Sequence, residues 1–297
     1  MLSPRSRKSS LLASLCLVVG CRSTVQRYQP PSAPVTEISH NDYQALLSKY
    51  VGDDGKVAYG KWKDSAQDVT SLDQYLVQVT NFTPDTHSQL FKTNVDSLSF
   101  WINLYNAIVL REVIRSWPLA SVNDIRPSAT SFIKQGKGFF YDLKFMIGGQ
   151  TMNLLDIENK IIRERFHDAR IHFGINCGSA SCPLLRKEAF DSARLESQLE
   201  TASRAFVNDI RNVDVRDSSQ EVWLSEIFKM YKDDFGSFAK QKGRDSGLLD
   251  FLLLYAQGPL VGKLTSAKAN GYKLRFQQYD WSVNNQDDKD EALLQER

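Results

Sequence analysis

The chain has 297 residues, of which 42% are hydrophobic and 24% are charged, a composition typical of a globular protein. Its 37 basic residues nearly balance its 35 acidic ones, and three of the basic residues lie within the first eight positions. The rest of the chain is therefore close to neutral, which argues against a nucleic-acid-binding protein, because such a protein needs a basic face.

The first 20 residues predict a secretory signal peptide. Three basic residues precede a short apolar run, 11–19, which ends at Gly20. That run is too short for a permanent transmembrane helix. Cys21 directly follows the small residue, an order that resembles the lipobox of bacterial lipoproteins, in which the cysteine is lipidated. We therefore expect residues 1–20 to be a lipoprotein signal peptide and Cys21 to be the lipidation site. An ordinary signal peptide is the alternative.

Beyond the leader, composition divides the chain into three parts. Residues 21–36 predict a lipidated N-terminus with a proline-rich tether, because proline stiffens the chain and opposes helix formation. Residues 37–283 predict a single folded domain. Residues 284–297 are polar and acidic, and we expect them to form a disordered tail.

Helical spacing of apolar residues predicts most of the domain's elements. The expected helices cover residues 41–50, 72–79, 97–116, 154–166, 188–210 and 248–255, and a further helix is capped by Ser225. The helix over 97–116 is apolar on nearly every side, so we expect it at the centre of the domain.

Two hairpins complete the prediction. Residues 144–153 form the first around two glycines, and residues 213–215 and 221–224 form the second. Residues 273–276 predict one more strand. The sequence therefore predicts a mainly helical α+β fold with a small antiparallel sheet.

The segment 170–185 is the strongest candidate for chemistry. Its first half alternates weakly, as a strand does, and its second half is rich in small residues that allow a sharp turn. His172 and Cys177 could form a thiolate–imidazolium pair, with Cys177 as nucleophile and His172 as base.

Two alternatives compete with this interpretation. Cys177 and Cys182 could form a disulfide, because neighbouring thiols in an oxidising compartment tend to be joined. A metal site built from His167, His172 and Cys177 is disfavoured, because their spacing does not place them on one face of a helix or strand.

Three polar residues elsewhere are candidates for orienting the substrate or the imidazole. Asn103 and Asn106 lie one turn apart on the central apolar helix, and the alternative is that they bind loop backbone. Asp280 lies between two aromatic residues and is either a buried orienting group or a local turn former. Asp156 and Glu158 open a helix and are expected to interact with its dipole.

Several motifs in order resemble the DUF547 family. The matching segments are residues 49–51, 55–59, 100–107, 155–158, 170–173, 176–179, 181–184, 224–228, 234–235 and 279–282. The family has no established activity. Its pattern commonly has histidine and glycine where this chain has Asn159 and Lys160, so no role of that histidine is transferred. Plant members resemble this chain at Cys177 but have serine in place of Cys182. This resemblance implies that a disulfide between these two positions is not a general feature of the family.

Together these observations predict a lipid-anchored envelope protein with a thiol-dependent acyl-transfer or hydrolase-like site. The alternative is a non-catalytic binding or scaffold domain with a Cys177–Cys182 disulfide. Thiol–disulfide exchange ranks lower, because the spacing of the two cysteines is wider than in redox dithiols. We expect no metal and no cofactor. The expected partners are a membrane, reached through the N-terminal lipid, and an envelope protein or a peptide-like substrate. Arg22 after the anchor favours the outer membrane.

Overall fold

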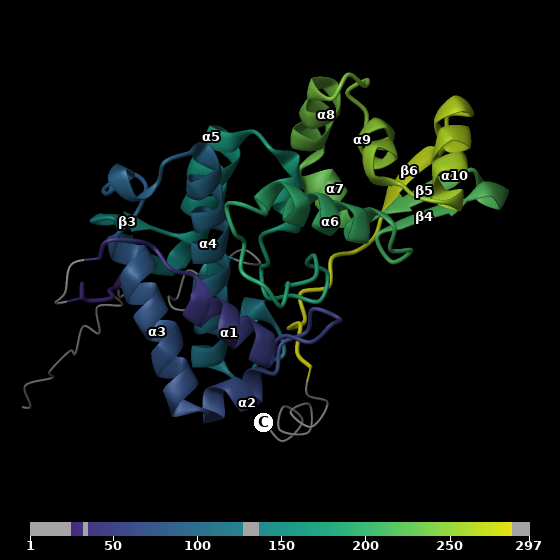
Figure 1. Ribbon diagram of the computed structural model, residues 1–297. Coiled ribbons are helices and arrows are strands. Elements are labelled where there is room, and N and C mark those ends of the chain that lie inside the picture. Colours follow the sequence, from purple (N-terminus) through teal and green to yellow (C-terminus); the bar gives the residue numbers. More distant parts are fainter. Residues whose placement is uncertain (1–24, 32–34, 127–136, 287–297) are drawn as a thin grey trace, which may run out of the picture.

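The computed structural model describes residues 25–31, 35–126 and 137–286, and its fold is mainly helical α+β, as the sequence predicts (Figure 1). Its buried apolar residues form two clusters, one drawn from residues 43–199 and one from residues 169–267. The predicted signal peptide, the lipidation site Cys21 and most of the predicted tail lie outside the described residues.

The N-terminal lobe comprises the elements from β1 to α5. Its helices are α1 (Asn41–Tyr50), α2 (Tyr59–Asp64), α3 (Ala66–Asn81), α4 (Asn94–Ser116) and α5 (Glu164–Phe166). Short 3-10 or π-helical segments are η1 (Ser88–Leu90), η2 (Val122–Asp124), η4 (Lys137–Asp142) and η5 (Asp156–Arg163). Its strands are β1 (Val25–Gln26), β2 (Lys144–Ile147) and β3 (Gln150–Met152).

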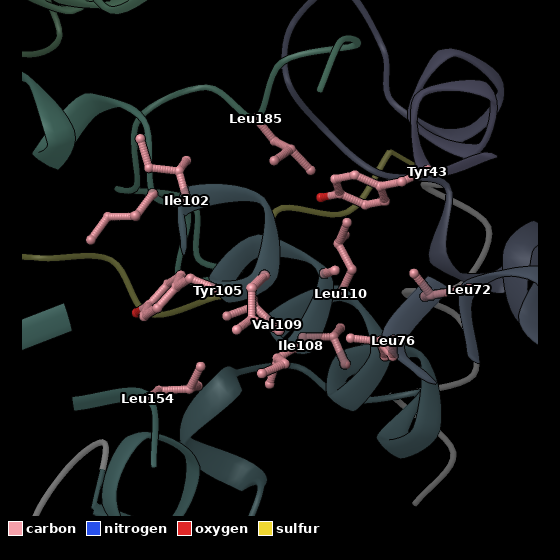
Figure 2. Close-up of a cluster of buried hydrophobic side chains, with 14 of the residues drawn as sticks. Tyr43, Leu72, Leu76, Ile102, Tyr105, Ile108, Val109, Leu110, Leu154 and Leu185 are labelled. Carbon is pink, nitrogen blue, oxygen red and sulfur yellow. The ribbon is translucent and has the colours of Figure 1, made fainter. Parts of the chain in front are cut away.

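Helix α4 is the core of this lobe, as its all-round apolar sequence predicts. A reciprocal pair of hydrogen bonds between Thr93 and Asp96 caps its first turn. Its middle is buried on every side. Figure 2 shows Leu76 of α3 in the same cluster of buried apolar side chains as Ile108 and Leu110 of α4.

The first predicted hairpin is confirmed. Strands β2 and β3 pair antiparallel, and the turn between them has positive φ at both Gly148 and Gly149. The tether prediction for residues 21–36 is wrong in part, because β1 pairs in parallel with β2 and Tyr28 packs against the core. A two-residue strand has too short a pattern to be recognised in the sequence.

The C-terminal lobe comprises the elements from η6 to β6. Its helices are α6 (Leu195–Val207), α7 (Glu226–Met230), α8 (Lys232–Gln241), α9 (Leu248–Tyr255) and α10 (Pro259–Ala269). Its 3-10 segments are η6 (Ala169–Phe173) and η7 (Asp217–Ser219), and its strands are β4 (Val213–Arg216), β5 (Glu221–Leu224) and β6 (Lys273–Phe276). The core of this lobe is rich in phenylalanine; Phe173 of η6 lies among these rings and joins the lobe to the cysteine-containing loop.

The second hairpin and the last predicted strand are also confirmed, but the expectation of one antiparallel sheet is wrong. There are two sheets of three strands among the described residues, and each joins an antiparallel hairpin to one parallel strand. Strands β1 and β6 lie far along the chain from their partners. Hairpin turns are visible in a sequence, whereas the direction of a distant partner strand is not.

Two local predictions need correction. The helix predicted over 188–210 begins only at Leu195, because backbone N–H groups before it bind side chains of other parts of the fold; Ala189, for example, donates to Gln44. The weak strand predicted at the start of 170–185 is the 3-10 segment η6, in which the Asp168 side chain accepts from the Arg170 N–H.

The segment after β6 returns to the N-terminal lobe, and Figure 1 shows it as the yellow trace that leaves β6. Single bridges join Ser282 to Ser121 and Val283 to Ser179. Residues 284–286, assigned to the tail by sequence, continue this pairing: the Asn284 side chain is buried and accepts from the Tyr59 hydroxyl at 2.9 Å. The folded domain therefore includes residues 284–286.

No helix among the described residues has both the length and the apolar character needed to cross a membrane.

Candidate active site

The loop that carries both cysteines is shaped by its own amide and glycine residues. The Asn176 side chain donates to the Pro183 carbonyl at 2.7 Å and accepts from the Gly178 N–H at 2.8 Å. Gly178 has φ of +78°, and a Cβ there would lie 3.3 Å from side-chain carbons of Val113 and Val122. The small residues therefore provide the tight turn that the sequence predicts.

The two asparagines of α4 hold loops in place. Asn103 donates to the Phe190 carbonyl at 2.7 Å and accepts from the Phe190 N–H at 2.9 Å. Asn106 donates to the Gly174 carbonyl at 2.9 Å and accepts from the Asn176 N–H at 2.8 Å. Of the two roles considered for them, these contacts match the binding of loop backbone, which satisfies buried amides. Asn106 thereby fixes the backbone between His172 and Cys177.

The structure joins Cys177 and Cys182 in a disulfide, with sulfurs 2.22 Å apart and Cα atoms 6.2 Å apart. Both residues are half-buried. Two hydroxyl groups contact the Cys177 sulfur: that of Ser179 at 2.9 Å and that of Tyr279 at 3.1 Å. The Tyr279 hydroxyl is also 3.4 Å from the Cys182 sulfur. The sequence pattern singled out Asp280 and not its neighbour Tyr279.

His172 is buried beside this loop, with 2% of its surface exposed. Its Nε2 lies 2.8 Å from Oδ2 of Asp234, and its ring stacks on Tyr231 at a centroid distance of 3.7 Å. Its Nδ1 is buried and has no hydrogen-bond partner among the described residues. Burial lowers the pKa of His172 below its usual value of 6.5, although the hydrogen bond to Asp234 acts in the opposite direction.

The group that orients His172 is therefore Asp234, on α8. Arg163 holds this carboxylate with two hydrogen bonds, Nε to Oδ2 at 2.7 Å and Nη2 to Oδ1 at 3.0 Å. Burial acts to raise the pKa of Asp234, but the hydrogen bonds with His172 and Arg163 outweigh it and hold the pKa well below that of a free carboxylic acid. An ionised Asp234 only accepts, so the proton of His172 sits on Nε2 and its lone pair sits on Nδ1.

Asp280, one of the predicted orienting groups, does not take that role. Its side chain is exposed, and its Oδ1 accepts from the Ser282 N–H at 2.9 Å in a local turn. Asp234 was missed because it lies 62 residues from His172 in the sequence. The only signal for it was its place in the family motif at 234–235.

His172, Cys177 and Cys182 line one pocket of about 480 Å³. Its other lining residues are mostly apolar or aromatic: Tyr105, Phe140, Tyr141, Leu155, Glu158, Ile175, Pro183, Ile227, Met230, Tyr231, Tyr279 and Trp281. Figure 2 shows the Tyr105 hydroxyl turned away from the aliphatic cluster around α4. The fold therefore brings the predicted nucleophile and the predicted base to the wall of one cavity.

Glu158 has a different environment from the one predicted. It is 5% exposed, its Oε1 accepts from the Tyr231 hydroxyl at 2.5 Å, and its Oε2 lies 3.5 Å from the Tyr105 hydroxyl. At the start of the helix, the side chains of Asn153 and Asp156 each accept a hydrogen bond from the other residue's backbone N–H. Glu158 is thus a buried carboxylate on the pocket wall, a position that the periodicity of the sequence did not indicate.

Among the described residues, no group of three or more histidine, cysteine, aspartate or glutamate side chains could hold a metal ion. The three residues considered for a metal, His167, His172 and Cys177, form no such group. His167 instead ends α5 with φ of +52°.

Residues 90–207 match the family model described as "Protein of unknown function, DUF547". The matched region contains α4, Glu158, His172 and both cysteines, so the chain carries the uncharacterised domain type that its motifs resemble. This match covers less than half of the 297-residue chain. The match ends before Asp234 and Tyr279. No curated protein and no solved structure matches the chain.

Proposed function

We propose that this protein is a thiol-dependent acyl-transfer or hydrolase-like enzyme, with Cys177 as nucleophile, His172 as general base and Asp234 as the group that orients the base. One observation carries the proposal: His172 is buried, its Nε2 is bound to an ionised carboxylate, and its Nδ1 has no partner among the described residues. An imidazole held in this way, on the wall of a pocket that a cysteine also lines, has the features of a base that activates a thiol.

The reaction proceeds in two steps. The Cys177 thiol passes its proton to Nδ1 of His172, and the thiolate attacks the carbonyl carbon of an ester or amide. The C–O or C–N bond breaks, the leaving group takes the proton from the imidazolium, and a thioester remains on Cys177. Water or another nucleophile then attacks the thioester and releases the thiol. The hydroxyl groups of Ser179 and Tyr279, which contact the sulfur, stabilise the thiolate.

The disulfide form cannot perform this reaction, because the Cys177 sulfur is bonded to Cys182. A dithiol reductant converts the disulfide into two thiols and is itself oxidised to a disulfide. The proposed enzyme is therefore active only after reduction.

Cys182→Ser tests this proposal, with Cys177→Ser as the matched control. The first variant keeps a free Cys177 without reductant, and the second cannot form the thioester. We expect Cys182→Ser to give a burst of one p-nitrophenolate per chain from p-nitrophenyl acetate and to gain one acetyl group by intact mass. Cys177→Ser gives neither. The wild-type chain behaves as Cys182→Ser only after reduction. Equal, burst-free rates in the two variants would contradict the proposal.

The disulfide itself favours a second candidate, a non-catalytic binding or scaffold domain of the cell envelope. In that case the bond serves to close the loop 177–182, and neither cysteine reacts when freed. The prediction that separates the two is the labelling rate of Cys177 in Cys182→Ser by iodoacetamide at pH 6. A structural thiol is labelled no faster than a cysteine peptide, and an activated thiol is labelled much faster.

We further propose that the protein is anchored by lipid at Cys21 in the bacterial envelope, facing the periplasm, with the outer membrane favoured. The support is the order of basic residues, apolar run, Gly20 and Cys21 in the sequence. We expect labelled palmitate to be incorporated into the wild-type chain and not into Cys21→Ser, which should leave the membrane fraction. Equal labelling of both chains would contradict the anchor.

A further inference from the structure

The pocket that contains His172 and Cys177 has one carboxylate on its wall among the described residues, that of Glu158. The remaining lining is dominated by apolar side chains and by six aromatic ones besides His172. These are Tyr105, Phe140, Tyr141, Tyr231, Tyr279 and Trp281. A carboxylate in such surroundings is costly to bury unless something compensates its charge.

Within the described part of the chain, no lysine or arginine forms an ion pair with Glu158. Arg163, whose charge acts on Glu158, directs its guanidinium to Asp234 and to the side-chain oxygen of Asn159. Glu158 receives only two neutral hydroxyl groups, from Tyr231 and Tyr105. A carboxylate has about four acceptor sites, so two of those of Glu158 have no hydrogen-bond partner among the described residues.

The aromatic side chains favour the same kind of ligand. Phe140, Trp281 and Tyr279 follow one another along one part of the lining, with ring centroids 6.0 and 4.4 Å apart. The faces of aromatic rings attract cations, and tryptophan does so most strongly. An apolar wall also accommodates the aliphatic chain that carries the charge.

We infer that this pocket binds a primary ammonium group on a short aliphatic chain, with the ammonium donating to Glu158. The chemistry at Cys177 rests on the proposed function: there, the ester or amide carbonyl of the same molecule meets the nucleophile. The substrate class is therefore an amino-bearing acyl compound, such as a peptide with a lysine-like side chain or a free amino terminus.

The test measures binding of n-butylammonium to the oxidised wild-type chain, which cannot be acylated, by calorimetric titration. The neutral 1-butanol and the quaternary tetramethylammonium ion serve as comparison ligands. We expect n-butylammonium to bind more tightly than both, because only it is both charged and able to donate to Glu158. Failure of the acylation experiments would leave this result unaffected, so the two proposals fail separately.

Glu158→Gln should weaken n-butylammonium binding about tenfold or more, because it removes a charge-assisted hydrogen bond. Glu112→Gln is the matched control, since Glu112 is a glutamate of α4 that is buried away from the pocket. It should leave the affinity unchanged. Should Glu158→Gln fail to fold, the rise in wild-type melting temperature with n-butylammonium, compared with 1-butanol, gives the answer.

Three outcomes would overturn the inference. They are equal affinities for n-butylammonium and 1-butanol, unchanged affinity in a folded Glu158→Gln variant, and tighter binding of tetramethylammonium. The last would point to a lipid headgroup of the choline type rather than to an amino group.

Discussion

At the scale of single residues, two carboxylates of the site differ in the hydrogen-bonding groups that surround them. Asp234 is bound by Arg163 and His172, so its charge is compensated and it fixes the imidazole. Glu158 lies on the pocket wall and has only tyrosine hydroxyl groups as hydrogen-bond partners among the described residues. The same side-chain chemistry thus supports positioning in one place and ligand binding in the other.

The first prediction concerns Asp234→Asn in the Cys182→Ser background. We expect the rate of acylation by p-nitrophenyl acetate to fall about a hundredfold or more, because an amide no longer fixes the proton on Nε2 of His172. Asp233→Asn, an exposed neighbour on the same helix, should leave the rate unchanged.

The pH profile separates this role from a purely structural one. Burial lowers the pKa of His172, so we expect the imidazole to stay neutral, and the proposed activity to persist, at pH values below 6.5. Asp234 acts to raise that pKa, so its removal should move the acid limb of the profile to still lower pH. A loss of rate with an unmoved acid limb would contradict the pairing.

The lowered pKa of His172 also affects stability. Below pH 6.5 the unfolded chain binds a proton at this residue more readily than the folded one does, so we expect the free energy of unfolding to fall as the pH drops below 6.5.

At the scale of elements, α4 lines the pocket through Tyr105 and supports the neighbouring loops through two buried amides. The Asn103 side chain binds the backbone of Phe190, and the Asn106 side chain binds the backbone of Gly174 and Asn176. Gly174 and Asn176 lie in the short segment between His172 and Cys177. An apolar helix with two inward amides can thereby fix two loops that lack regular hydrogen bonding of their own.

The second prediction concerns the amide of Asn103. Asn103→Leu leaves the N–H and carbonyl of Phe190 buried without their partner, and should cost about 2–4 kcal/mol of unfolding free energy. Chemical denaturation measures this loss. Val95→Ala, at an exposed position of the same helix, should change stability little. If the Asn103→Leu variant remains folded at low temperature, its Cys177 thiol should keep its reactivity. Lost reactivity at unchanged stability would instead make Asn103 part of the reacting site.

At the scale of the whole molecule, the pocket draws on both lobes and on the segment that returns after β6. Tyr105 and Glu158 come from the N-terminal lobe, Tyr231 from the C-terminal lobe, and Tyr279 from the returning segment. The region matched by the family model supplies the cysteines and His172 but ends before Asp234. The complete site therefore needs the C-terminal lobe as well as the matched region.

The third prediction is that reduction leaves the fold intact. The disulfide closes a loop with a sequence separation of only 5, so its loss should cost no more than about 2 kcal/mol. Neither cysteine is among the buried residues that make up the two apolar clusters, and Cys177 packs only against the edge of the first. Thermal unfolding with and without a phosphine reductant should differ by only a few degrees. The double variant Cys177→Ser/Cys182→Ser should not respond to reductant. Unfolding of the wild type on reduction would favour the scaffold candidate.

The sequence by itself determined the features that depend on near neighbours. Apolar periodicity predicted the central place of α4, and the paired glycines predicted the turn at Gly148 and Gly149. Small residues around Gly178 indicated the sharp turn, and the ordered motifs indicated the family whose model matches residues 90–207. The spacing of His172 and Cys177 suggested a pair, because both lie on one short segment.

Only the tertiary structure decided which distant groups meet that segment. In the folded chain, Asp234 and not Asp280 binds His172, Glu158 lines the pocket, and the Tyr279 hydroxyl contacts the Cys177 sulfur. The tertiary structure also paired β1 and β6 with strands far from them in the chain. The physical reason is that periodicity and turn chemistry act over a few residues. Contacts between groups distant in the chain depend instead on how the lobes pack. That packing is set by the entropy cost of closing the loops between them and by the apolar surface that becomes buried.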